Sequence, residues 1–96
     1  MQTITKKTLV QAISRNKGLD PKQVQIVVQK LLDYVTENLA EGNRFEFRNF
    51  GVFEIVRREQ KIGRNPKNPT QPIIIPARDA VKFTSGNKLT GLVRGD

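Results

Sequence analysis

The residue types with the clearest chemical potential lie in one stretch, residues 57–76, which combines cations with prolines. Its first eleven positions hold five basic side chains against the single acid Glu59. The basic residues are Arg57, Arg58, Lys61, Arg64 and Lys67. Four of the chain's five prolines follow at positions 66, 69, 72 and 76. Because proline has no N–H for a strand ladder and is confined to strand edges, ends and bulges, the stretch predicts a protruding two-stranded arm with a proline-rich tip.

A rigid apolar ring at the end of a cationic ribbon has a physical use on a double helix. Lysines and arginines neutralise phosphates along the minor groove, and an inserted proline unstacks two base pairs and kinks the duplex. The kink costs about a few kcal/mol, which is recovered when the bent duplex contacts more basic surface. The alternative is that Pro66, Pro69 and Pro72 only shape a loop and block edge-to-edge pairing of strands.

The charge of the chain is unevenly distributed. The formal net charge is +8, from 17 basic and 9 acidic residues, and residues 43–96 hold +6 of it against +2 for residues 1–42. A basic half of this kind predicts a polyanionic partner, either nucleic acid or an anionic membrane surface. The alternative is that the charge serves general solubility.

The residue types that are missing argue against other classes of function. There is no histidine and no cysteine, so the commonest general base, thiolate ligands and disulfides are excluded. The acidic residues are scattered, which predicts no catalytic, metal or cofactor site and leaves a nucleic-acid enzyme as a weak alternative. No signal peptide, membrane span or basic amphipathic helix is present, so we expect a cytoplasmic protein without a membrane partner or small-molecule substrate.

Two helices are predicted at the start of the chain. Thr5 is a suitable N-cap for a helix over residues 6 to about 16, and Gly18 a suitable stop. Asp20 and Pro21 begin a second helix that runs to about residue 40. Its apolar stripe is wide for a helix with one partner. The short turn resembles a helix-turn-helix, but the second helix has nearly balanced charges, which favours a packing platform over a groove-reading pair.

The hydrophobic period changes from 3.6 to 2 after Gly42, which predicts strands. A strand beginning at Phe45 leads to a tight turn at residues 49–51 and a second strand over residues 52–56. Four of the five phenylalanines lie in residues 45–53 and are expected in a core rather than stacked on bases.

The return through the arm follows the same alternating pattern. Ile62-Gly63 is expected to break the outgoing strand, and residues 73–75 to bring the chain back. Pro69 and Pro72 are expected to stiffen the tip. A last strand ends at about residue 83, and Thr84 or Ser85 is expected to cap a short final helix.

The predicted fold is therefore α+β, with two N-terminal helices, a three-stranded antiparallel sheet with an extended β-ribbon arm, and a short C-terminal helix. We expect one domain over residues 1–96. Residues 1–42 would form a helical dimerisation platform, residues 43–83 the sheet with its arm at about 57–76, and residues 84–96 the C-terminal helix.

Several motifs resemble one known family. KIGRNP at residues 61–66 is similar to the arm signature of the bacterial HU and integration host factor family of histone-like DNA-bending proteins. NFGVF at residues 49–53 resembles the family's turn and core phenylalanines, and the likeness extends over essentially the whole chain. The resemblance implies an intertwined dimer that binds double-stranded DNA in the nucleoid, bends it by proline intercalation and compacts or shapes the chromosome. The alternative is a site-specific accessory factor, like integration host factor, in recombination, replication or transcription.

The resemblance also assigns roles to residues. Pro66 would intercalate, with Arg64 and Asn65 beside it in the minor groove. The residues expected to bind DNA are Arg57, Arg58, Lys61, Arg64, Asn65, Pro66, Lys67, Arg78, Lys82 and Lys88. The residues expected in the interface of a homodimer, or of a heterodimer with a paralogue, are Val28, Leu31, Leu32, Val35, Phe47, Phe50 and Phe53.

The chain departs from the family pattern at two places. Asn68-Pro69-Thr70 replaces the usual Thr-Gly turn, and the segment 66–76 is longer than usual by a single residue, which makes Pro69 a competitor for the intercalating role. The last helix has Asn87 and Thr90 where many members carry lysines, which predicts weaker contacts from the flank of the body.

Overall fold

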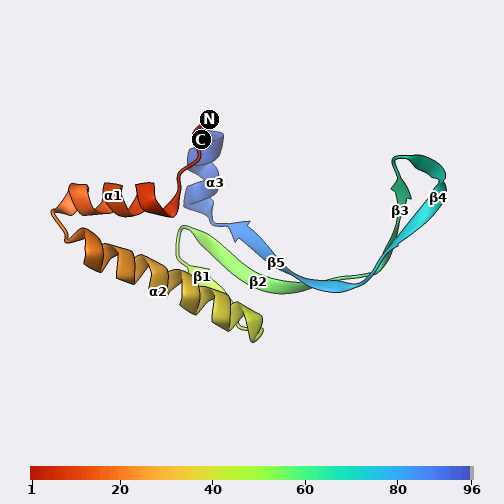
Figure 1. Cartoon of the computed structure of the whole chain (residues 1–96), viewed down its shortest axis with the longest axis horizontal. Helices are drawn as coiled ribbons and strands as arrows, with labels where there is room; N and C mark the ends of the chain where they lie inside the picture. The colour runs from red at the N-terminus through yellow and green to blue at the C-terminus, as the bar shows by residue number, and fades with distance from the viewer. Residues whose placement is uncertain (96) are drawn as a thin grey trace. The chain divides into compact units, whose positions relative to one another are not determined.

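The computed structural model describes residues 1–95, apart from the side chain of Lys17. It divides into two compact units, Met1–Glu37 and Asn38–Asp96. The element order confirms the predicted α+β class: two helices, a three-stranded antiparallel sheet, a two-stranded ribbon and a short last helix (Figure 1). The elements are α1 (Lys6–Lys17), α2 (Pro21–Ala40), β1 (Phe45–Phe47), β2 (Gly51–Arg58), β3 (Lys61–Asn65), β4 (Asn68–Ile75), β5 (Arg78–Ser85) and α3 (Asn87–Arg94).

Helix α1 begins and ends at the predicted capping residues, and α2 begins at its predicted cap. The Thr5 hydroxyl accepts a hydrogen bond from the N–H of Thr8 at 3.3 Å and caps α1. Gly18 closes α1 in the left-handed conformation, with φ of 61°. The Asp20 carboxylate accepts from the N–H of Lys22 at 3.0 Å at the start of α2. These local bonds fix both helix boundaries.

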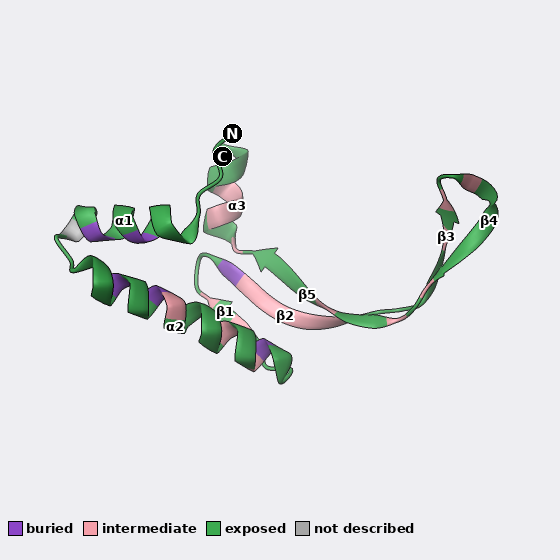
Figure 2. Ribbon diagram, viewed as in Figure 1, coloured by how far each residue is buried: buried purple, intermediate pink, exposed green. Residues whose placement is uncertain are grey.

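The core of the first unit is small. Val10 of α1 packs against Val24 and Val28 of α2, and these three are the buried apolar residues of this unit (Figure 2). Ser14 is also buried, and its hydroxyl donates to the carbonyl of Val10 at 2.7 Å, so no polar atom is left unpaired there. Other apolar side chains of α2 stay exposed, including Leu31 at 51% and Leu32 at 47%.

The sheet has the order β1–β2–β5, with both pairs antiparallel. Between β1 and β2, the N–H of Phe50 donates to the carbonyl of Phe47 at 2.9 Å, and Asn49 adopts φ of 69°. A tight turn is thus confirmed, but it covers residues 48–50 instead of the predicted 49–51, because Gly51 begins β2. Gly51 follows the turn and is buried. A Cβ atom there would lie 2.5 Å from a ring carbon of Phe83 and 2.6 Å from the carbonyl oxygen of Thr84, so only glycine fits.

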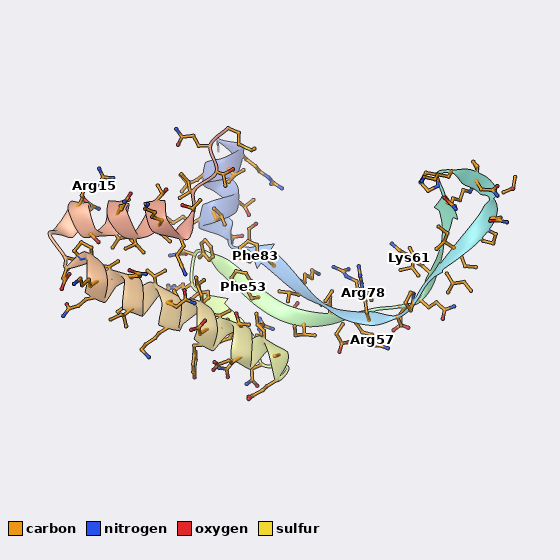
Figure 3. The ribbon with its side chains drawn as sticks, viewed as in Figure 1. Arg15, Phe53, Arg57, Lys61, Arg78 and Phe83 are labelled. Atoms are coloured by element: carbon orange, nitrogen blue, oxygen red, sulfur yellow. The ribbon has the colours of Figure 1, made fainter. Side chains whose placement is uncertain are left out.

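All five phenylalanines gather into one cluster on this sheet and its first turn. The rings of Phe53 and Phe83 lie 4.7 Å apart between centroids, and those of Phe50 and Phe83 lie 5.5 Å apart (Figure 3). The prediction that they pack together is confirmed. None of the rings is buried, however, and Phe50 remains 48% exposed, so the cluster is an incomplete core.

The arm is the β3–β4 ribbon, which is joined to the sheet strands by residues 59–60 and 76–77. Two predictions about it were wrong. Ile62-Gly63 does not break the outgoing strand but lies within β3, paired with Ile74 and Ile73, and the interruption falls at residues 59–60. Pro69 and Pro72 do not form the tip but lie within β4, because both strands of a two-stranded ribbon are edges that tolerate proline.

The last predicted helix cap was also wrong. Thr84 and Ser85 belong to β5, where they pair with Val52 and Gly51, so the strand extends beyond residue 83 and neither side chain caps α3. Gly86 is the N-cap of α3, without a side-chain bond, and its own N–H donates to the carbonyl of Phe50 at 2.8 Å. Among the described residues no helix combines the length and apolar character needed to cross a bilayer.

Candidate nucleic-acid interface

The tip of the arm is a two-residue loop. Asn65 and Asn68 face each other across the ribbon, which leaves Pro66 and Lys67 as the connecting residues. The Asn65 side-chain oxygen accepts from the N–H of Lys67 at 3.0 Å, and Thr70 donates to the Asn68 side-chain oxygen at 2.7 Å. The first of these bonds forms an Asx turn, which holds the loop in one conformation. Pro66 is therefore an exposed ring at the apex of a braced hairpin.

The other two arm prolines have different positions. Pro72 lies directly opposite Arg64 in the ladder, and Pro69 follows Asn68 in β4. Both line an open hollow of about 510 Å³ on the ribbon. The remaining lining residues are Ile62, Gly63, Arg64 and Thr70. Pro66 lies in the loop at the end of the ribbon, whereas Pro69 and Pro72 lie within β4, so the position of Pro69 does not favour it as the intercalating residue.

The cations of the arm are exposed and unpaired. Lys61, Arg64 and Lys67 have no ion-pair partner among the residues that the structure describes. An exposed, unpaired cation keeps its full charge for an external anion.

The arm also exposes large apolar side chains, of which Ile62 was predicted as part of a strand break and residues 73–75 as strand formers. Ile62 and Ile74 lie directly opposite each other and are 73% and 64% exposed. The ribbon has no core of its own, and most of β3 and β4 is exposed in Figure 2. The signal was present in the sequence, because isoleucines in a segment flanked by prolines and cations have nothing to pack against within the ribbon. An amphipathic ribbon of this kind can contact both the charged and the apolar parts of a ligand.

At the base of the arm, the two neighbouring arginines of β2 have different cross-strand partners. Arg57 pairs with Asp79 of β5 at 3.2 Å, whereas Arg58 lies opposite Arg78. Successive side chains of a strand point to opposite faces, and in Figure 3 Arg57 and Arg78 leave the ribbon on opposite sides. The predicted binding residues Arg57 and Arg58 are therefore not brought together, although both are exposed.

Two predicted binding residues outside the arm, Lys82 and Lys88, each lie beside another charge or dipole. Lys82 of β5 lies opposite Glu54, whose carboxylate also lies 3.7 Å from Arg44. Lys88 is exposed in the first turn of α3. A cation in a first turn is disfavoured by the helix dipole, so its position is electrostatically costly unless an anion lies nearby.

The residues predicted in a dimer interface differ in how far one chain already covers them. Val28 is the most covered, at 9% exposure in the small core of the first unit. Val35, Phe47 and Phe53 are half-buried. Leu31, Leu32 and Phe50 are about half exposed. The last three are apolar surface that a single chain leaves in contact with water.

A cationic ribbon that presents an apolar ring at its end is the geometry of an architectural nucleic-acid-binding protein. The family described as "Bacterial DNA-binding protein" matches residues 4–94. A probable DNA-binding protein HU from Chlamydia trachomatis is 50% identical over 93 residues, which cover 97% of this chain and 93% of the relative. An integration host factor subunit beta from Halorhodospira halophila is 39% identical over 87 residues, covering 90% of this chain and 84% of that relative.

The solved structures agree with these relatives. An Anabaena HU–DNA cocrystal structure superposes with a TM-score of 0.84 and 28% sequence identity, covering 96% of this chain and 99% of that one. The chain belongs to the HU and integration host factor family of architectural DNA-binding proteins, which confirms the resemblance seen in its arm and turn motifs.

Proposed function

We propose that a dimer of this chain binds duplex DNA with its two arms in the minor groove and bends it by inserting Pro66 between base pairs. The observation that carries the proposal is the position of Pro66 at the apex of the hairpin, exposed, with Arg64 and Lys67 unpaired beside it. Binding of this kind would place the protein on the nucleoid and shape the DNA there.

The braced tip supports insertion of Pro66. Unstacking a base step costs about a few kcal/mol, so the inserting group must lose little freedom on binding. Proline loses essentially no side-chain entropy when it is buried, and the Asn65–Lys67 bond fixes the loop in the free protein. The exposed Ile62 and Ile74 supply apolar surface that would be covered in the groove.

The dimer is supported by the apolar surface that one chain leaves open. The phenylalanine cluster has no buried ring, and Leu31 and Leu32 of α2 are half exposed. We keep residues 1–42 as the dimerisation platform, residues 43–83 as the sheet with the arm at about 57–76, and residues 84–96 as the C-terminal helix. Sedimentation equilibrium of the purified chain tests the dimer, and a monomer at micromolar concentration would refute a homodimer and leave a paralogous partner.

The bending step is tested with duplexes that carry a fluorophore at each end. Wild type should bring the two ends closer, and Pro66→Ala should lose most of the energy transfer while still binding. Pro69→Ala is the matched control, because it removes the same ring from the same arm without touching the apex. If Pro66→Ala bends DNA as well as wild type, or if Pro69→Ala loses the bend instead, Pro66 is not the intercalating residue.

A second candidate is site-specific binding, favoured by the 39% identity to an integration host factor subunit. Members of that kind would read a site partly through the shape and deformability of the DNA. A gel-shift competition at stated salt between random, pre-bent and genomic duplexes separates the two candidates. General architectural binding predicts equal competition by random and genomic fragments of the same length, whereas site-specific binding predicts a small set of strong competitors.

A further inference from the structure

Two like charges face each other where the sheet meets the arm. Arg58 is the last residue of β2 and Arg78 the first of β5, and the register places them directly opposite. Such residues share one face, with Cβ atoms about 4.5–5.5 Å apart. Both are exposed, and neither has an ion-pair partner among residues 1–95. Because directly opposed like charges are destabilising, an anion between them would relieve an unfavourable contact.

The opposite face of the same two strands is arranged differently. Arg57 and Asp79 form the next cross-strand pair, and their charged groups lie 3.2 Å apart. Since side chains alternate along a strand, this neutral pair lies on the other face from Arg58 and Arg78. The base of the arm therefore has one neutral face and one face with two uncompensated positive charges.

We propose that Arg58 and Arg78 together form one anion site that holds a single DNA backbone phosphate, and that Arg57 takes no direct part in binding. This rests on the proposed DNA-binding function and specifies the contact at the root of the arm. Each guanidinium presents a planar fork of N–H donors that matches phosphate oxygens. Two such groups rooted about 5 Å apart can converge on one phosphate.

The position of the site gives it a mechanical consequence. Residues 59–60 and 76–77, which follow Arg58 and precede Arg78, lie outside the strands. The arginine pair is thus the last rung of the sheet ladder before the interruption. A phosphate bound by both side chains would bridge β2 and β5 at their last paired residues. It would therefore hold the two strands together at the base of the arm when DNA is bound.

The test measures how the affinity for a random duplex depends on salt, by fluorescence anisotropy, for wild type and four variants. These are Arg58→Gln, Arg78→Gln, the Arg58→Gln/Arg78→Gln variant, and Arg57→Gln/Asp79→Asn as the control. The control removes the neighbouring ion pair without changing the net charge. Circular dichroism checks that each variant keeps its fold, which exposed side chains should not perturb.

A shared phosphate predicts a non-additive pattern. Each single variant should keep the log–log salt slope within about 0.5 of wild type, because the remaining arginine still neutralises the phosphate. The Arg58→Gln/Arg78→Gln variant should lower the slope by about 1.8, which is about 0.9 for one phosphate in each half of a dimer. Arg57→Gln/Asp79→Asn should leave the slope unchanged, because it removes a neutral pair.

Three results would overturn the shared site while the proposed function stands. The first is a fall of about 1.8 in each single variant, which would show two separate phosphates. The second is an unchanged slope in the Arg58→Gln/Arg78→Gln variant. The third is a fall of about 1.8 in Arg57→Gln/Asp79→Asn, which would show that Arg57 neutralises a phosphate of its own. If wild type itself shows no salt-dependent binding to duplex DNA, the proposed function fails, and this site with it.

Discussion

Raising the salt concentration is the perturbation whose effect follows most directly from the charges of the arm. Among the described residues, the arm and its base offer four sets of unpaired cations: Lys61, Arg64, Lys67 and the Arg58–Arg78 pair. If each set neutralises one phosphate, a dimer makes about eight phosphate contacts and releases the counterions of each. The expected log–log slope is about −7, so raising salt from about 50 to 200 mM should lower the affinity roughly 10⁴-fold.

The assay is a titration of a random duplex at five or more salt concentrations, with the equilibrium constant measured by anisotropy. Lys61→Gln should reduce the magnitude of the slope by about 1.8, because one contact is lost from each chain. Lys30→Gln is the matched control, since Lys30 is an exposed lysine of α2 outside the arm. A wild-type slope of magnitude below about 4, or equal effects of the two variants, would refute the count of arm contacts.

The remaining predictions concern the elements that hold the arm. Gly51→Ala should destabilise the fold by about 2 kcal/mol or more, because the new methyl group overlaps Phe83. Denaturant unfolding at fixed protein concentration measures the loss of stability, and an unchanged unfolding midpoint would contradict the prediction. Asp20→Ala should cost about 1 kcal/mol through loss of the α2 cap in the same assay, and no loss would mean the cap contributes nothing. Asn65→Ala removes the bond to Lys67 and should reduce DNA bending more than Asn68→Ala does; equal bending would show that the brace is dispensable.

The starts of the first two helices and the end of α1 were predictable because they depend on local bonds. Thr5, Gly18 and Asp20 act on residues within a few positions of themselves, so a short window of sequence contains the whole interaction. The apex was predicted only in part: Asn65 and Pro66 restrict the backbone next to them, but Pro69 and Pro72, expected at the tip, lie within β4.

The strand boundaries and the partners of the arginines could not be predicted, because they depend on residues in a neighbouring strand. Ile62-Gly63 and Ser85 were predicted as a break and a cap, but each is held in a strand by residues at least ten positions away. Arg57 and Arg58 were both predicted among the DNA-binding residues. Only the register shows that the first faces Asp79 and the second faces Arg78. Alternation alone places the two arginines on opposite faces, but it does not identify which of them is neutralised.

The measurement that tests the central claim most directly is base unstacking in bound DNA. Duplexes with the fluorescent base 2-aminopurine at flexible pyrimidine–purine steps report unstacking as a rise in emission. Wild type should produce this rise at saturating protein and moderate salt, whereas Pro66→Ala, bound to the same extent, should leave the base stacked and dim. A duplex that is bound and bent by wild type with no rise at any step, or an equal rise with Pro66→Ala, would contradict the claim that this ring separates the base pairs.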